Sequence, residues 1–393
     1  MYAELNQINI ENWQSDPNVS INIGKVIELA SWKKSPFEPF VGSGTDRGIR
    51  TYKVDVKAPY RPRLQAPLTG SGVRGNADFD TNLDTMEILS QTVEPDNVGN
   101  SMKSEIKQYS DIKNIDFVKQ AVPSLTDWIV RKRDKYFVTA LSNDVTNCVV
   151  ADAGATGFKD GSNAKSVNEL SRQIQKGDVL TVKALSKAIF MAKNGVKYNG
   201  KEAFPIKPMR STRHTVGGIN IENYSYVILL DSYQCNQLRN DPLWREMQKI
   251  GVRGNENNIF TGLVGIIENC PVIDMGVWTK LNVGLLNSEV SDAEYKENII
   301  AANFSNKITP PSYYTDAQPL SMGFLIGASA LLMVGSEQTK FYIDDMQDVG
   351  RKTICGVDKL FAISKARFQS PAGQRTIFDN QDFATIAIFS SKE

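Results

Sequence analysis

The stretch DIKNIDFVKQAVPSLTDWIVRKRDKYFVTALS, residues 111–142, has the clearest helical pattern in the chain. Its apolar residues recur mostly three or four positions apart, which gives a helix one apolar face: Val118, Val122, Leu125, Trp128, Ile129, Phe137, Ala140 and Leu141. Pro123 predicts a kink or the first turn of a C-terminal segment, and Ser124 with Asp127 resembles a capping box for that turn. We expect a long helix with Trp128 in a filled core site.

A basic run follows the tryptophan on the same predicted helix: Arg131, Lys132, Arg133 and Lys135. Such a run is most often a solvated helix face, and the alternative is a phosphate-binding patch. We expect the solvated face.

The segments after this helix alternate between helix and strand patterns. Residues 182–195 predict a helix that stops at Asn194-Gly195. A buried strand is expected over 224–231, then a helix that Pro242 breaks, then two strands within 259–274. The apolar stretch 323–335 is ambiguous between helix and strand, and 360–368 and 382–391 read as closing strands. The polar residues 279–320 predict an insertion or surface loop.

Composition restricts the function classes. The 393 residues carry a net charge of +1 and are 41% hydrophobic, which disfavours both a strongly basic DNA binder and a disordered chain. No stretch predicts a membrane span or a signal peptide, so we expect cytoplasmic synthesis. The four cysteines are too far apart for a C-x-x-C motif and are expected to be reduced and buried. The single histidine, His214, is expected in a surface loop, and no catalytic or metal site is predicted.

The sequence GSGVRG, residues 70–75, matches the dinucleotide-binding fingerprint G-x-G-x-x-G. That motif needs a buried strand before it and a helix after it. Three prolines and three basic residues precede it, and acidic residues that would repel a pyrophosphate follow it. The context therefore favours a mobile loop over a cofactor site.

Residues 50–103 predict a long β-hairpin around this loop. RTYKVDVKA, residues 50–58, alternates polar and apolar side chains, and MEILSQTVE, residues 86–94, is a second candidate strand. Neither has enough apolar residues for a buried sheet, and an isolated hairpin is marginally stable in water. The hairpin therefore needs a partner surface. The polar residues before it carry large aromatics and are expected to form an arm that lies on another surface.

An ordered set of motifs is similar to the N4-like phage major capsid protein family, which has the Hong Kong 97 (HK97) type coat fold. The resemblance runs from about residue 50 to the end and rests on six stretches, in order: RPRLQAPLTGSGVRGNADFDTNLDTMEI (61–88), LTDWIVRKRDKYFVTALS (125–142), YVILLDSYQCNQLRNDPLW (226–244), NNIFTGLVGIIENCPVID (257–274), FLIGASALLMV (324–334) and DFATIAIF (382–389). The insertion at 279–320 departs from the general family pattern.

The resemblance implies an α+β fold with an N-terminal arm at 1–49 and an extended hairpin loop at 50–108. It further implies a peripheral domain with a spine helix at 109–175, an axial domain at 176–335, and a return to the peripheral domain at 336–393. The extended loop is expected to reach over a neighbouring subunit. Gly70, Gly72 and Gly75 would act as hinges at its tip, and its contact candidates are Arg61, Arg63, Arg74, Asp78, Asp80 and Asp84.

The implied function is that of the major capsid protein of a tailed double-stranded DNA phage, which assembles into the hexamers and pentamers of an icosahedral shell. It implies no enzyme activity, cofactor, metal or membrane. Expected partners are copies of the chain, portal and scaffolding proteins, a decoration protein in some relatives, and weakly bound packaged DNA. The expected location is the virion capsid, assembled in the host bacterial cytoplasm. The alternatives are a nucleotide-dependent α/β oxidoreductase that uses GSGVRG, and a phage tail or adhesion module.

Overall fold

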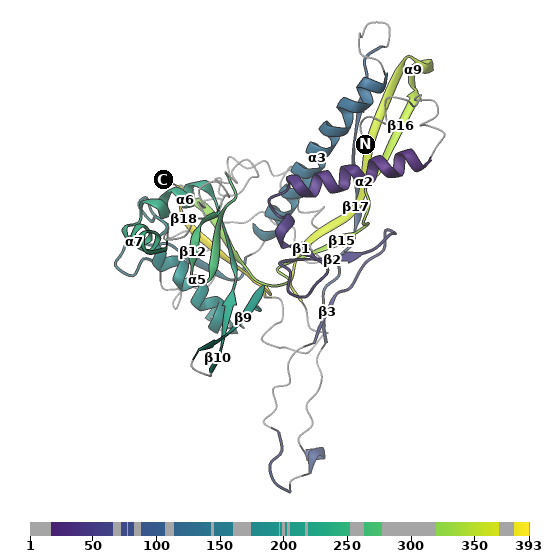
Figure 1. Ribbon diagram of the computed structural model, residues 1–393. Coiled ribbons are helices and arrows are strands. Elements are labelled where there is room, and N and C mark those ends of the chain that lie inside the picture. Colours follow the sequence, from purple (N-terminus) through teal and green to yellow (C-terminus); the bar gives the residue numbers. More distant parts are fainter. Residues whose placement is uncertain are drawn as a thin grey trace.

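Two six-stranded β-sheets, a long helix and a projecting hairpin make up the subunit (Figure 1). The computed structural model describes residues 17–65, 72–76, 78–81, 88–106, 114–142, 145–159, 174–195, 197–198, 201–202, 205–216, 219–251, 263–276, 320–368 and 381–392. The polar segment predicted as an insertion at 279–320 lies outside them, apart from its last residue.

The first sheet, here called the β17 sheet, is built around a 14-residue strand, β17. On one side of β17 lie β15 and β16, both antiparallel to it, and on the other lies β5, also antiparallel. β2 pairs in parallel with β15, and β1 with β2. Its strands are β1 (Val41–Gly42), β2 (Ile49–Lys53), β5 (Asp96–Lys103), β15 (Leu331–Gly335), β16 (Lys340–Met346) and β17 (Lys352–Lys365).

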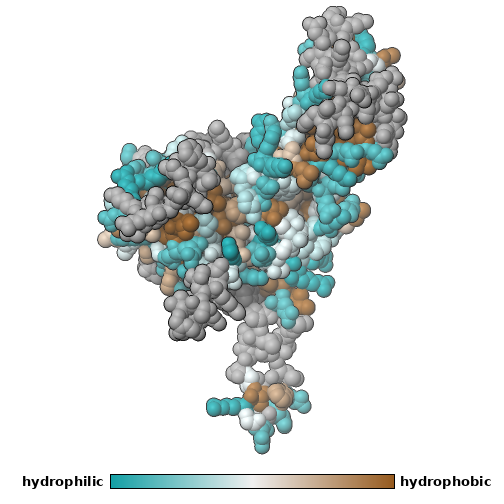
Figure 2. Space-filling view, viewed as in Figure 1, coloured by the Kyte–Doolittle hydropathy of each residue, from teal (hydrophilic) through white to brown (hydrophobic). Residues whose placement is uncertain are grey.

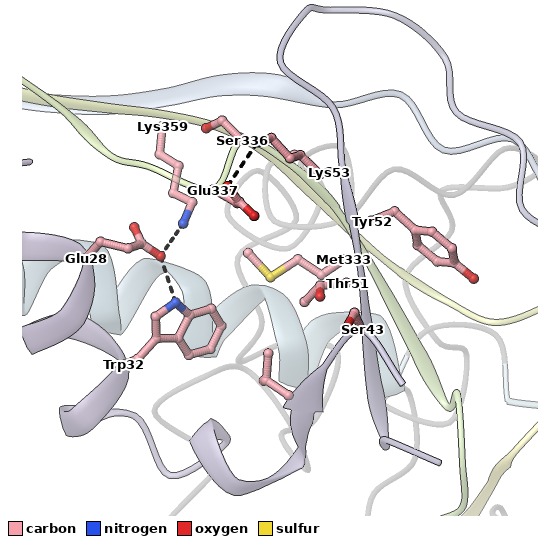
Figure 3. Close-up of a pocket in the computed structure, with 12 residues that line it drawn as sticks. Glu28, Trp32, Ser43, Thr51, Tyr52, Lys53, Met333, Ser336, Glu337 and Lys359 are labelled. Carbon is pink, nitrogen blue, oxygen red and sulfur yellow. Dashed lines mark hydrogen bonds and ion pairs between the residues drawn. The ribbon is translucent and has the colours of Figure 1, made fainter. Parts of the chain in front are cut away.

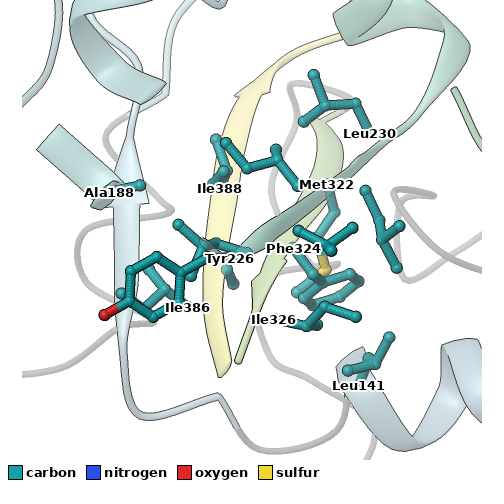
Figure 4. Close-up of a cluster of buried hydrophobic side chains, with 14 of the residues drawn as sticks. Leu141, Ala188, Tyr226, Leu230, Met322, Phe324, Ile326, Ile386 and Ile388 are labelled. Carbon is teal, nitrogen blue, oxygen red and sulfur yellow. The ribbon is translucent and has the colours of Figure 1, made fainter. Parts of the chain in front are cut away.

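The second sheet, here called the β18 sheet, has the order β12-β13-β11-β14-β18-β6. Every residue of β11, β14 and β18 is buried, as expected for strands covered on both faces. Figure 4 shows the packing of Tyr226, Met322, Phe324 and Ile388 in this core. Its strands are β6 (Cys148–Val150), β11 (Val227–Leu230), β12 (Leu263–Ile267), β13 (Cys270–Asp274), β14 (Leu320–Ile326) and β18 (Thr385–Ser391).

Shorter elements complete the described chain. The helices are α2 (Pro17–Lys34), α3 (Asn114–Ser142), α5 (Val182–Asn194), α6 (Ser232–Asn240), α7 (Pro242–Gly251) and the single turn α9 (Gln347–Gly350), with 3-10 turns η2 (Glu38–Phe40) and η3 (Phe79–Thr81). Three two-stranded sheets are formed by β3 (Arg63–Gln65) with β4 (Ile88–Ser90), β7 (Lys197–Tyr198) with β8 (Lys201–Glu202), and β9 (Arg210–Val216) with β10 (Ile219–Ser225).

The helix α3 spans 29 residues without a break at Pro123. The prediction of a cap at Ser124 is wrong, because its hydroxyl donates a hydrogen bond back to the Gln120 carbonyl within the helix. The N-terminal half of α3 packs on the β17 sheet through Val118, Leu125 and Ile129, in a cluster with Phe341 and Val357. The C-terminal half belongs to the main core, which includes the β18 sheet. One helix therefore contributes to the cores of both sheets.

Residues 17–49 of the predicted arm pack on the rest of their own chain. Helix α2 lies across α3 and β16. Gly24 permits this close approach, since a Cβ there would lie 2.2 Å from the Thr339 carbonyl oxygen. Phe37 is buried with its ring centroid 4.9 Å from that of Phe137. Phe37 and Phe40, with Trp32 packed beside them, thus belong to the main core of the same chain.

Several other sequence predictions are settled by the strand pairing. The ambiguous stretch 323–335 contributes to two strands, β14 and β15, which belong to different sheets. The strand read from residues 50–58 is not a hairpin arm, because β2 pairs in parallel with β15 inside the β17 sheet. His214 lies in β9, opposite Ile221, so its prediction as a loop residue is wrong. The four cysteines are free and buried, as expected.

Core packing along α3 leads to a first prediction. Phe137 is fully buried, whereas Trp128 is only partly buried at the edge of the cluster that contains Phe341 and Val357. Trp128 is therefore not the filled core site that the sequence predicted. We expect Phe137→Ala to lower the free energy of unfolding of the unassembled subunit by about 3–5 kcal/mol. Trp128→Ala should cost less, about 1–3 kcal/mol. Denaturant unfolding of both variants measures the difference, and an equal or reversed order would contradict this description of the core.

Candidate subunit-contact surfaces

The projecting hairpin has a firmly anchored base. Leu89 and Val93 are fully buried, and they pack against side chains of β15 and the end of β17. The buried amide of Gln91 donates to the Ser364 hydroxyl (2.7 Å) and the Lys365 carbonyl (2.8 Å), and its oxygen accepts from the Arg367 amide (2.8 Å). The base of the hairpin is therefore part of the subunit's own core.

The tip of the hairpin has the opposite character. Gly72 and Gly75 have φ values of 70° and 71°, and a Cβ at either would meet no atom within 4 Å. Phe79 is 80% exposed, and Figure 2 shows the resulting hydrophobic patch at the far end of the molecule. An aromatic side chain gains free energy on burial, so this exposed ring is a candidate for burial in a contact. The tip has turn geometry and apolar surface but no core.

Most of the contact candidates lie on this extension. Arg74, Asp78 and Asp80 are exposed at the tip, and Arg61 and Arg63 are exposed nearer the base. Gly70 and Asp84 lie outside the described residues. Charges of both signs therefore flank the exposed Phe79.

The surroundings of GSGVRG do not resemble a dinucleotide site. The strand before it, β3, has three residues and pairs antiparallel with β4. The element after it is the 3-10 turn Phe79–Thr81. A fingerprint requires a buried parallel strand before the glycines and an α-helix whose N-terminal amides face the pyrophosphate. The described geometry thus supports the loop interpretation of these glycines.

A buried ionic cluster joins the two sheets where the chain passes from β17 to β18. Asp382 accepts from Lys365 (2.9 Å), Arg367 (2.8 Å) and the Thr146 amide (2.9 Å). Burial alone would raise the pKa of Asp382, but the two cations and these hydrogen bonds outweigh it and lower the pKa. Because Arg367 also donates its amide to Gln91, the cluster connects both sheets to the hairpin base.

A second polar cluster fastens α2 to the β17 sheet and lines a pocket of about 250 Å³ (Figure 3). Glu28 accepts hydrogen bonds from the Trp32 indole (2.7 Å) and the Thr339 hydroxyl, and it forms an ion pair with Lys359. Burial lowers the pKa of Lys359, while Glu28 opposes that shift. A buried carboxylate with three partners holds the helix in one position on the sheet.

Arg133 belongs to the same cluster, so the prediction of a solvated basic face is wrong for this residue, whereas Arg131 is exposed and Lys132 and Lys135 are partly exposed. Its side chain is 1% exposed, its guanidinium stacks 3.5 Å from the Trp32 ring centroid, and it donates to the Ser31 carbonyl (3.0 Å). Burial lowers its pKa to about 10. The sequence spacing indicated this burial, because Arg133 lies four residues from both Ile129 and Phe137 and so shares their buried face of the helix.

Comparison with known proteins identifies the family. The model of a phage capsid protein family matches residues 33–392. The chain belongs to the phage capsid protein family. The capsid chain is also 43% identical, over the full length of both, to the major structural protein ORF14 of Helicobacter pylori bacteriophage KHP30.

Solved capsid structures share the fold. The capsid structure of phage KHP30 superposes with a TM-score of 0.77 at 44% identity over 92% of both chains, and the head structure of phage KHP40 gives 0.77 at 45% identity over 98% and 99%. The capsid of cyanophage Pam1, at 14% identity, has a TM-score of 0.63 and shares the fold alone. The expected α+β capsid fold is confirmed, and the protein is a major capsid protein that forms the shell of a phage virion. This is a structural family, and no helix in the described residues could cross a membrane.

The environment of Asp134, beside Arg133, predicts an unusual pH dependence. Burial raises the pKa of Asp134 to about 6 from an ordinary 3.8, although the Ser35 hydroxyl (2.7 Å) opposes the shift. Between these values the folded subunit holds a proton that the unfolded chain has lost, so this group makes the subunit less stable as pH rises. The contribution of Asp134 to the free energy of unfolding should fall by roughly 1 kcal/mol from pH 5 to pH 7.

Unfolding of the unassembled subunit between pH 4 and 7 measures this effect. The free energy of unfolding of the wild type minus that of Asp134→Asn should vary with pH in that window. The wild type should gain stability relative to the variant as pH falls. Ser35→Ala removes the hydrogen bond that favours the ionised carboxylate, so it should move the window to higher pH. A wild-type minus Asp134→Asn difference that is constant with pH would contradict the assignment.

Proposed function

We propose that this capsid protein builds the icosahedral shell of a tailed double-stranded DNA phage, with its copies arranged in hexamers and pentamers. The observation that carries the proposal is the full-length similarity to phage KHP30 and KHP40 proteins that stand in capsid and head structures. The order of the sequence motifs supports a narrower relationship to the N4-like phages. The five-part division into arm, extended loop, peripheral domain, axial domain and returning strands is part of the same proposal.

The hairpin extension is proposed as the contact between neighbouring subunits. Its base is tied to the subunit core, while its tip exposes Phe79 and carries Arg74, Asp78 and Asp80 at the surface. A symmetric shell presents the same tip to the same neighbouring surface many times, so a weak contact is repeated at each equivalent position. Gly72 and Gly75, with Gly70, would let the tip bend during assembly.

A capsid shell must start its assembly, take up the genome and close, and each of these steps calls for further partner proteins. We expect a portal protein, a scaffolding protein and, where the shell needs reinforcement, a decoration protein. The near-neutral charge of the chain supports only weak contact with packaged DNA. Assembly is expected in the cytoplasm of the host bacterium.

Deleting residues 62–84 and replacing them with a short glycine-serine turn tests whether the extension is needed for shell assembly but not for folding of the subunit. The deletion spares Leu89, Gln91 and Val93, which are the fully or almost fully buried residues of the hairpin base, and it removes only Pro62 and the partly buried Leu64 from their surroundings. We expect a folded subunit that does not form stable shells. Circular dichroism and thermal melting report folding, and electron microscopy reports shells. An unfolded monomer would show that the extension is needed for the subunit's own core.

Arg74→Glu tests the electrostatic part of the contact. An exposed ion pair contributes only about 0–1 kcal/mol, but a closed shell repeats it at every equivalent contact. We expect lower shell yield with an unchanged melting temperature of the isolated subunit. Moderate salt should weaken wild-type shells, because it screens exposed charges. Light scattering measures assembly, and normal shells from Arg74→Glu would remove this arginine from the contact.

A further inference from the structure

The outer surface of the two long helices is rich in cations. Helix α2 ends in two exposed lysines, Lys33 and Lys34, whereas its single carboxylate, Glu28, is buried in the polar cluster beneath the helix. Helix α3 exposes Arg131 and, in part, Lys135. These cations come from segments about 100 residues apart in the sequence, so only the packing of the helices can bring them together.

The contacts between α2 and α3 gather these side chains at one junction. The Lys34 ammonium lies 2.6 Å from the Asp127 carboxylate of α3, and Arg131 donates from its Nε to the backbone carbonyl of the same Asp127 (3.3 Å). Lys135 follows Arg131 by four residues and so lies one helical turn further along α3. Lys33, Lys34, Arg131 and Lys135 are here called the α2–α3 basic patch.

The nearby carboxylates leave part of this positive charge unpaired. Asp127 is already engaged in the ion pair with α2, and Asp134 is partly buried and accepts a hydrogen bond from the Ser35 hydroxyl (2.7 Å). In the part of the chain that the structure describes, neither Lys33 nor Arg131 forms an ion pair. The patch therefore presents unpaired cations to solvent, although the whole chain is nearly neutral.

The opposite face of the β17 sheet is acidic. Val357 is buried under the helices, and its neighbour Asp358 lies on the open face, because side chains alternate between the two faces of a strand. A hollow on that open face is lined by nine residues that include Asp344 and Asp358 but no lysine or arginine. Hydrogen bonds from the Gln347 side chain and the Met346 amide lower the pKa of Asp344, which keeps it ionised. A polyanion would be repelled from this face and attracted to the helical one.

The composition of the patch suits a phosphate backbone better than a protein surface. Protein contacts depend on buried apolar and aromatic side chains, and charged residues are depleted at their centres. Leu29, which is 66% exposed, lies further along α2, but no large apolar side chain is exposed at Lys33, Arg131 or Lys135 themselves. Lysine and arginine bind phosphates and release the counterions that surround them, which favours binding of duplex DNA.

We propose that the α2–α3 basic patch binds the phosphate backbone of duplex DNA, through Lys33, Lys34, Arg131 and Lys135. Phosphate contacts carry no sequence information, so the patch accepts any duplex. This inference rests on the proposed function, in which the shell encloses a DNA genome, and it names the surface that meets that genome. Segregation of charge between the two faces of the β17 sheet explains how a chain with a net charge of +1 binds a polyanion weakly at one place.

Titration of a fluorescently labelled DNA duplex with the unassembled subunit tests the proposal, with anisotropy as the readout. Four phosphate contacts give a slope of about −3 to −4 in a plot of log K against log salt. The double variant Lys33→Gln with Arg131→Gln should lower the affinity at low salt about tenfold and reduce the magnitude of that slope by about 2. Wild-type affinity in this variant, or a wild type that does not bind DNA at low salt, would overturn the proposal.

A matched control removes the same amount of charge elsewhere. Lys340 and Arg351 are exposed at either end of the β16–β17 hairpin, away from the patch. Lys340→Gln with Arg351→Gln should bind DNA as the wild type does. Thermal melting of both double variants should stay close to that of the wild type, because exposed positions contribute little to stability. Equal loss of affinity in the two variants would mean that net charge acts, rather than the patch.

Electron microscopy of the shells separates this inference from the proposed function. Lys33→Gln with Arg131→Gln should still form shells, since the change removes no buried side chain. If the wild-type chain itself forms no shells, the proposed function is wrong, whereas the DNA titration still decides whether the patch binds phosphate. If the double variant loses its shells but keeps its affinity for DNA, the patch is a contact with another protein and the proposal is wrong.

Discussion

The burial of both halves of α3 is the constraint on which the rest of the subunit depends. Its first half closes the core of the β17 sheet, and its second half enters the main core with the β18 sheet. A helix of 29 residues is about 44 Å long at 1.5 Å per residue, so it acts as a strut between the two sheets. Deforming the subunit would expose apolar surface in both cores, which makes the two sheets one mechanical unit.

Buried ion pairs fix the relative positions of the helices and sheets more narrowly than apolar packing alone. Glu28 with Lys359 and Arg133 fixes α2, and Asp382 with Lys365 and Arg367 fixes the passage from one sheet to the other. A buried ion pair adds little net stability, because desolvation offsets the attraction, but an unpaired partner is costly. Each cluster therefore penalises any displacement that separates its members. A shell built from many copies needs such a uniform subunit geometry.

The hairpin shows how one segment divides folding from assembly. Residues near its base, such as Leu89 and Gln91, are satisfied within the subunit, whereas Phe79 at its tip is not. In a symmetric shell, the proposed contact would bury this exposed ring in the same way at every equivalent position.

The sequence by itself determined the local elements, because periodicity and turn residues act over a few positions. Such local signals predicted the end of α5 at Asn194-Gly195 and the interruption of the helix before Pro242, where α7 begins. The helical periodicity of the apolar residues likewise predicted α3. The loop character of GSGVRG also followed from its neighbours. Only the tertiary structure decided that residues 323–335 divide between two sheets, that β2 joins β15 rather than the hairpin, and that Arg133 is buried. These depend on partners far away in the chain: the spacing of Arg133 places it on the buried face of α3, but its burial is stable because Trp32 and Ser31, from another helix, receive the guanidinium.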